Sequence, residues 1–142
     1  MTTTVVNSYA NSGGYSPMAA GTLVRSSQLR SVTAAIIIDE LLAEVEVPAG
    51  AKIVGVGYQA SDLDSSGSPA FTADIGDASD DDRFVAASTV GQAAGATADS
   101  AFVIANRGYQ YTAKTKVQLT CKAAPATSAT SGNIYFWVDW TA

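Results

Sequence analysis

Residues 133–140 read NIYFWVDW, and this stretch decides the fold because its side chains alternate between two faces. Successive side chains of a β-strand point to opposite sides, so the two-residue period predicts a strand. One face carries Ile134, Phe136, Val138 and Trp140, and the other carries Tyr135, Trp137 and Asp139. Two packed layers bury only one face of a strand. We therefore expect the second aromatic face to be covered by another segment, such as the N-terminal residues, or by another subunit.

Stretches with the same strand character recur along the chain from residue 22 onward. β-Branched residues and two-residue alternation predict strands at Thr22–Ser26, Ser31–Asp39, Glu44–Val47, Lys52–Ala60, Phe71–Ile75 and Ala101–Ala105, and a further strand signal in Tyr109–Tyr111 followed by Thr115–Lys122. In Lys52–Ala60 the period places Val54, Val56 and Tyr58 on one face, and the two glycines between them leave room for a β-bulge.

The segments between these strands are rich in turn-forming residues. Residues 61–69, 77–82 and 123–132 are expected to form loops. Asp39–Ala43 also fits one helical turn, and Ala86–Ala98 fits either a short helix or a long surface excursion. About eight short strands with little helical periodicity predict an all-β fold, namely an antiparallel β-sandwich of jelly-roll or Greek-key type.

The N-terminal 21 residues differ in composition from the remainder of the chain. Residues 22–142 are expected to form a single β-sandwich domain, whereas residues 1–21 are rich in Thr, Ser, Asn and Gly. This composition predicts an extended N-terminal arm that is either flexible or bound to a partner. The apolar side chains of the arm that are candidates for such a contact are Val5, Val6, Tyr9 and Tyr15.

Composition argues against catalysis. The 142 residues include no histidine, which removes the commonest general base and the commonest metal ligand. The one cysteine, Cys121, cannot form an internal disulfide, and it shares the predicted inward face of Thr115–Lys122 with Val117 and Leu119. We expect a protein that is not an enzyme and that carries no cofactor.

Charge and hydropathy limit the partners. The net charge is −5, and the eight Lys and Arg residues are scattered, so we expect no nucleic-acid partner. No apolar stretch is long enough to cross a bilayer, and the N-terminus lacks the basic start and apolar middle of a signal peptide. These features predict no membrane partner and synthesis in a cytoplasm.

Two acidic segments carry carboxylates that are candidates for a metal site. Asp62–Gly67 reads DLDSSG, the first half of a calcium-binding loop, but the twelfth position holds Ala73 where a bidentate Glu is needed. The alternative is a turn in which Asp and Ser side chains bond the local backbone. The group Asp77, Asp80, Asp81 and Asp82 fits a divalent cation, a basic patch on a partner, or a charged loop that blocks edge pairing. We assign no metal ligand in either segment.

The order of several segments resembles a known class of viral protein. These segments are Val47–Ile53, Phe71–Gly76 leading into Asp77–Phe84, Gly108–Ala113 and the terminal aromatic strand. They resemble small structural proteins encoded among the head genes of tailed bacteriophages, and the resemblance covers roughly Val32 to the C-terminus. The segment before Thr22 has no counterpart in it.

The resemblance implies a capsid decoration, or cement, protein. Such a protein is β-rich, is often a homotrimer, binds the major capsid protein on the exterior of the virion and is made in the host bacterial cytoplasm. It has no catalytic residues. The candidate interface residues here are Tyr135 and Trp137 together with the four apolar residues of the arm.

Two other functions remain open from the sequence. The first is a host-carbohydrate-binding module of a phage head or tail fibre, for which Tyr109, Tyr111 and Trp137 are the candidate residues. The second is a major capsid or tail-tube subunit, although the chain is short for the former and lacks a long pairing hairpin for the latter.

Overall fold

The structure is a computed structural model, and it describes residues 22–141. Its elements in chain order are β1 (Val24–Val32), β2 (Leu41–Val47), β3 (Lys52–Ala60), β4 (Thr72–Asp77), β5 (Asp80–Ser88), β6 (Gly95–Ala96), the short 3₁₀ turns η1 (Asp99–Ala101) and η2 (Ile104–Asn106), β7 (Tyr109–Gln110), β8 (Thr115–Ala123) and β9 (Gly132–Thr141). Within this part of the chain there is no α-helix. Likewise, no helix of residues 22–141 has the length and hydropathy required to span a membrane.

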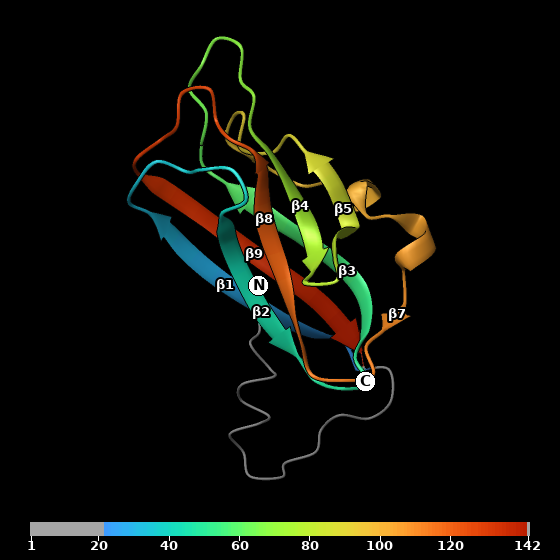
Figure 1. Ribbon diagram of the computed structural model, residues 1–142. Helices are drawn as coiled ribbons and strands as arrows, with labels where there is room; N and C mark the ends of the chain where they lie inside the picture. The colour runs from blue at the N-terminus through green and yellow to red at the C-terminus, as the bar shows by residue number, and fades with distance from the viewer. Residues whose placement is uncertain (1–21, 142) are drawn as a thin grey trace.

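The strands form two antiparallel sheets that pack face to face (Figure 1). Sheet A has the order β1-β9-β3-β6, with β7 also paired to β3, and sheet B has the order β2-β8-β4-β5. The order is nested, because β1 pairs with β9 and β2 pairs with β8. The predicted all-β sandwich is confirmed. Its assignment to a jelly-roll or Greek-key type remains a prediction with which the nested order is compatible.

The core lies between the two sheets and is built from alternate residues of the strands. On β9 the buried side chains are Ile134, Phe136, Val138 and Trp140. On β8 they are Val117, Leu119 and Cys121. Both sets agree with the predicted inward faces. Burial raises the pKa of the Cys121 thiol to about 11, so this cysteine is a core residue and a poor nucleophile.

The first two predicted strands are wrong in their bounds. One strand, β1, runs from Val24 to Val32 through residues 27–31, which are polar except for Leu29, and residues 33–40 then form a loop. The polar side chains are accommodated at the edge of sheet B: Arg30 donates to the carbonyl oxygens of Leu41 and Leu42, and Gln28 Oε1 accepts the N–H of Glu44. These contacts also block the free edge of β2 against another strand.

Other predicted elements are corrected as well. Asp39–Ala43 contains no helical turn, because Asp39 has a left-handed φ of 62° and β2 follows directly. Ala86–Ala98 contains no helix: β5 continues to Ser88, and after a turn the short β6 pairs with β3. The predicted strand Ala101–Ala105 is absent: it runs from the end of η1 into η2, and Phe102, which lies between the two turns, is buried.

Residues 77–82 also differ from the predicted loop. The turn between β4 and β5 is tight, and β5 begins at Asp80. The Asp77 carboxylate accepts the N–H groups of Ser79 and Asp80, which replaces a longer loop by a side-chain-capped turn.

Strand β3 has the predicted bounds and a bulge near its start. Its pairing register with β9 shifts between Ile53 and Gly55. The shift places Ile53 and Val56 in the core and moves Val54 off the core face, so the predicted face of Val54 is wrong. The bulge expected from the glycines is present.

Candidate functional site

Three loops meet at one end of the sandwich, and we call this end the loop end. It comprises residues 33–40, 61–71 and 124–131, which lie together opposite the end at which the described chain terminates (Figure 1). The loops at residues 61–71 and 124–131 are joined by the carboxylate of Asp64, which is 1% exposed. Asp64 Oδ2 accepts the N–H groups of Ala70, Phe71 and Ala126 at 2.7, 3.1 and 2.9 Å, and Oδ1 accepts those of Ser66 and Thr127 at 3.3 and 2.9 Å.

The environment of Asp64 explains its charge state. Burial by itself raises the pKa of a carboxyl group, but the backbone donors of Thr127, Ala70, Ala126 and Phe71 outweigh it and hold the pKa of Asp64 well below its usual value. Asp64 therefore stays ionised. Both of its oxygens are occupied by N–H donors, so the segment DLDSSG acts as a side-chain-bonded turn.

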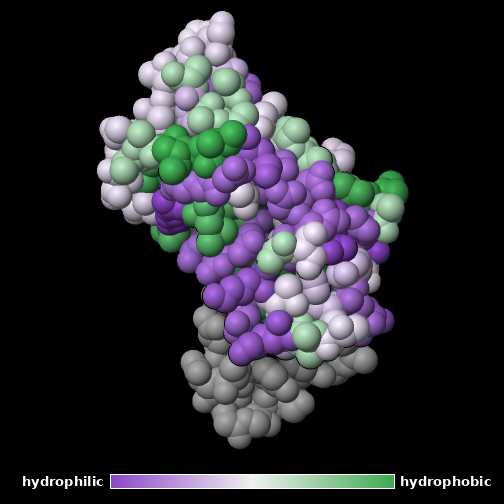
Figure 2. Space-filling view, viewed as in Figure 1, coloured by the Kyte–Doolittle hydropathy of each residue, from purple (hydrophilic) through white to green (hydrophobic). Residues whose placement is uncertain are grey.

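The loop at residues 33–40 carries an exposed apolar tip, formed by Ile37, Ile38 and the first residue of β2, Leu41. The exposed fractions of these side chains are 63%, 58% and 41%. Figure 2, viewed as in Figure 1, shows strongly hydrophobic areas around the loop that joins β1 and β2, with hydrophilic atoms between them. Exposed apolar side chains that gather in one region and are rimmed by polar residues typically mark a binding surface.

Hydrogen bonds on both sides hold the apolar tip in place. Ile36 is buried and donates its N–H to Ser128 Oγ at 2.8 Å, and Ile37 donates its N–H to Glu40 Oε1 at 3.1 Å. Asp39 donates its N–H to the carbonyl oxygen of Cys121 at 2.7 Å. Because these bonds fix the backbone, the tip is presented without a large loss of conformational entropy on binding.

The sequence reasoning missed the apolar tip. Three consecutive isoleucines were interpreted as strand residues, whereas only Ile36 enters the core. The signal that was available is the position of the run, directly before Asp39 and Glu40 and directly after two alanines.

The predicted aromatic face is present on the outside of sheet A. Tyr135 and Trp137 are partly buried, and their ring centroids are 5.7 Å apart. Trp137 lies over Gly57 of the neighbouring strand, where a Cβ atom would overlap the indole ring. Arg25 stacks on Trp137 at 5.2 Å and forms a bidentate salt bridge with Asp139 at 2.6 and 2.8 Å. The side chains of sheet A itself therefore cover much of this face.

A shallow groove adjoins the aromatic face at its loop end, and we call it the sheet A groove. Its volume is about 370 Å³, and it is lined by Leu29, Gln59, Ala60, Ser61, Ala94, Asn133 and Tyr135. Leu29 is 68% exposed and pairs across the sheet with Tyr135. The other predicted interface residues, Val5, Val6, Tyr9 and Tyr15, lie outside the described residues.

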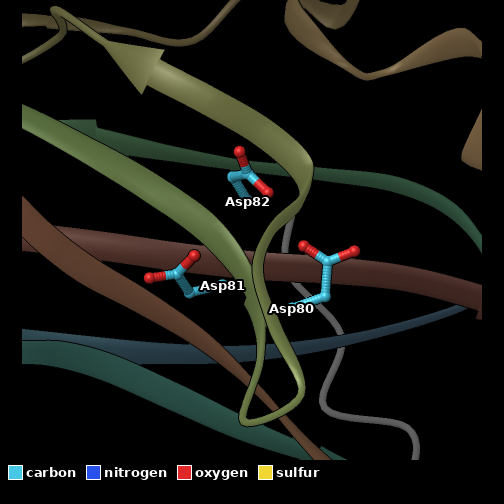
Figure 3. Close-up of side chains that lie close together, drawn as sticks. All are labelled: Asp80, Asp81 and Asp82. Atoms are coloured by element: carbon cyan, nitrogen blue, oxygen red, sulfur yellow. The ribbon is translucent and has the colours of Figure 1, made fainter.

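The acidic group divides into two environments. Asp80, Asp81 and Asp82 lie close together at the start of β5 (Figure 3). Asp81 accepts a bond from Lys122 Nζ at 2.6 Å, and Asp80 lies 3.8 Å from Arg83. The Asp80 carboxylate raises the pKa of Asp82, because it accepts a hydrogen bond from the protonated form of Asp82 and repels the charged form. Since two of the three carboxylates are engaged with basic side chains, we assign no metal ligand here.

Asp77 belongs instead to the core. Its Oδ2 accepts bonds from Arg83 Nε at 2.7 Å and from the Tyr111 hydroxyl at 2.6 Å. Burial opposes ionisation, but these donors hold the pKa of Asp77 below its usual value. The arrangement locks the β4–β5 turn to Tyr111, which precedes β8.

The aromatic residues considered for carbohydrate binding are not available for stacking. Tyr111 is buried, and Arg83 stacks on the ring of Tyr109 at 4.3 Å. Trp137 lies beneath Arg25. No free ring face is therefore presented by any of the three, and the structure does not favour a carbohydrate-binding module.

Comparison with known proteins connects the fold to bacteriophage capsids. A scan of protein-family models and a search of curated proteins both find no match. Among solved structures, a chain from the capsid of Ralstonia phage GP4 is similar with a TM-score of 0.70 and 28% sequence identity, over 88% of this chain and 87% of that chain. A chain from the cyanophage Pam1 capsid asymmetric unit is similar with a TM-score of 0.65 and 25% identity, over 86% of each chain. These similarities support a phage capsid-related, structural protein of the virion.

Proposed function

We propose that the chain is a non-enzymatic decoration protein that binds the exterior of a phage capsid and stabilises it. The observation that carries the proposal is the preformed apolar tip of Ile37, Ile38 and Leu41 on a fold similar to two capsid chains. A rigid apolar projection suits a contact with a protein lattice, because many copies multiply a modest contact into strong binding.

The distribution of charge supports an exterior position. Seven of the eight basic residues form salt bridges with carboxylates, namely Arg25, Arg30, Arg83, Arg107, Lys114, Lys116 and Lys122. Only Lys52 lacks such a partner among the described residues, and the net charge is −5. A surface of this kind offers packaged DNA little attraction, so we propose major capsid protein as the partner and no nucleic acid.

We also propose that the protein assembles as a homotrimer, as decoration proteins of this kind often do. Light scattering coupled to size-exclusion chromatography should give three times the mass of the chain. A mass equal to one chain at the concentration used for capsid binding would contradict the trimer.

Replacing both tip isoleucines by aspartate is expected to abolish capsid binding. I37D/I38D places two charges where the contact is apolar, and we expect at least a ~100-fold loss of affinity for purified heads that lack the protein. Co-sedimentation of heads with increasing amounts of protein measures this loss. Both side chains are exposed, so the thermal unfolding curve of the variant should match that of the wild type.

The matched control is I104D. Ile104 is 85% exposed on η2, away from the loop end, and I104D introduces the same kind of charge there. Binding of I104D at wild-type strength together with failure of the double variant would support the proposal. Wild-type binding by I37D/I38D would refute the role of the tip, and failure of the unmodified protein to bind heads would refute decoration.

A further inference from the structure

The sheet A groove has an uncharged lining in a protein whose surface is rich in ion pairs. None of its seven lining residues is Asp, Glu, Lys or Arg. Its side chains are apolar, as in Leu29 and the two alanines, or carry neutral polar groups, as in Gln59 and Asn133. The groove therefore fits an uncharged segment that combines apolar side chains with a polar backbone.

The N-terminal arm has the same chemistry. Residues 1–21 contain no charged side chain, whereas every Asp, Glu, Lys and Arg of the chain lies beyond them. Their most apolar run is Val5-Val6-Asn7-Ser8-Tyr9. Two valines and a tyrosine supply apolar surface for Leu29, and the amide and backbone groups supply partners for the side-chain amides of Gln59 and Asn133. No ion has to be desolvated when the two meet.

The length of the arm matches the distance to the groove. The described chain begins at Thr22, and Leu29 lies seven residues further along the chain, which corresponds to about 23 Å. A flexible chain of the 13 residues from Tyr9 to Thr22 has a root-mean-square span of about 20 Å. Effective concentration is highest when these two lengths agree, so the arm of the same chain outcompetes that of another copy.

We propose that residues 5–9 fold back and dock in the sheet A groove of their own chain, with their apolar side chains on Leu29 and their polar groups at the side-chain amides of Gln59 and Asn133. The arm then completes the cover of the aromatic face. The inference does not depend on the decoration role, because it concerns the purified chain in the absence of capsids.

Cysteine cross-linking in the full chain tests this docking. Cys121 is buried, and its pKa of about 11 keeps the thiol protonated and unreactive. Disulfides can therefore form only between the two introduced cysteines. We pair S8C in the arm with Q59C, an exposed position in the groove. The control pairs S8C with K52C. Lys52 is exposed at the other end of β3, and it lies close to Val24 because Val24 and Ile53 both pair with Trp140 of β9.

An undocked arm would reach K52C at least as easily as Q59C, because K52C is nearer to the start of the described chain. Docking predicts that the S8C/Q59C disulfide forms at least ~10-fold faster than the S8C/K52C disulfide under mild oxidation at low protein concentration. Introducing L29D into the S8C/Q59C protein should remove this preference, because a charge then faces the apolar run.

Three outcomes would overturn the inference. Equal rates for the two pairs would show an undocked arm. Disulfide-linked dimers as the main product would show that the groove takes the arm of another copy. An unchanged rate in the L29D background would show that the apolar lining does not select the arm. None of these outcomes bears on head binding, which the tip variants test separately.

Discussion

Replacing Asp64 by asparagine is expected to lower the midpoint of thermal unfolding by roughly 10 °C, which is a large effect for one isosteric substitution. The carboxylate accepts five backbone N–H groups, and these come from two loops that are more than fifty positions apart in sequence. An asparagine offers one acceptor oxygen and turns an NH₂ group toward the remaining donors. Several buried N–H groups would therefore lose their partner.

The effect of D64N is expected to depend on pH. The folded-state pKa of Asp64 is depressed relative to the usual Asp value of about 3.9 in an unfolded chain. Its contribution to stability is therefore complete above the unfolded pKa and is lost as pH falls through the folded pKa. The difference in the midpoint of thermal unfolding between wild type and D64N should keep about its full value from pH 5 to 8. It should shrink below about pH 4.

Asp62 supplies the matched control. It lies two residues earlier in the same segment and accepts one local bond from the N–H of Asp64, which an asparagine can also accept. D62N should change the midpoint by less than about 2 °C. Calorimetry or circular dichroism of both variants would measure this, and equal midpoints for D62N and D64N would refute the special role of Asp64.

Replacing Gly76 by alanine is expected to destabilise the protein by about 3 kcal/mol, because the added methyl group has no space. A Cβ atom on Gly76 would overlap the carbonyl oxygen of Asp80 and lie 2.5 Å from the carbonyl carbon of Asp81. Both are backbone atoms of the paired strand, which cannot rotate away as a side chain can. The substitution would force the tight turn between β4 and β5 apart and disturb the Asp77 network.

Gly67 provides the control for G76A. A Cβ atom there would meet nothing within 4 Å, so G67A should alter the free energy of unfolding by no more than about 0.5 kcal/mol. Urea unfolding followed by tryptophan fluorescence gives both values from the shift of the midpoint. A G76A midpoint within error of G67A would show that the turn relaxes freely.

The strands were predictable from the sequence where the two-residue alternation of apolar side chains coincides with one buried face. The alternation of residues 133–140 and 115–122 matched the buried faces of β9 and β8, because these strands have one face toward the core along their whole length. The predicted strand bounds were wrong where contacts with another strand override the local pattern of polar and apolar residues. Residues 27–31 are mostly polar yet remain in β1, since Gln28 and Arg30 bond the edge of β2.

The candidate site was less predictable than the fold. A turn at Asp62–Gly67 follows from its residues, but the bonds from Ala126 and Thr127 to Asp64 depend on a loop 62 and 63 positions away. Ile37 and Ile38 are exposed because hydrogen bonds of the loop backbone hold them outward, and no pattern of hydrophobicity encodes this orientation. Tyr135 and Trp137 were identified by alternation alone.

The pairing of β1 with β9 has a consequence for the order of folding. Strand β9 lies between β1 and β3, and the bond between Arg25 and Asp139 joins residues 114 positions apart. Until residues 132–141 have left the ribosome, β1 and β3 have no strand to hold them together. Sheet A must then form in a late, cooperative step whose loop-closure entropy makes it slow, in the range of milliseconds to seconds typical of β-sandwiches. During synthesis the exposed edges of both strands would be the segments most prone to aggregate.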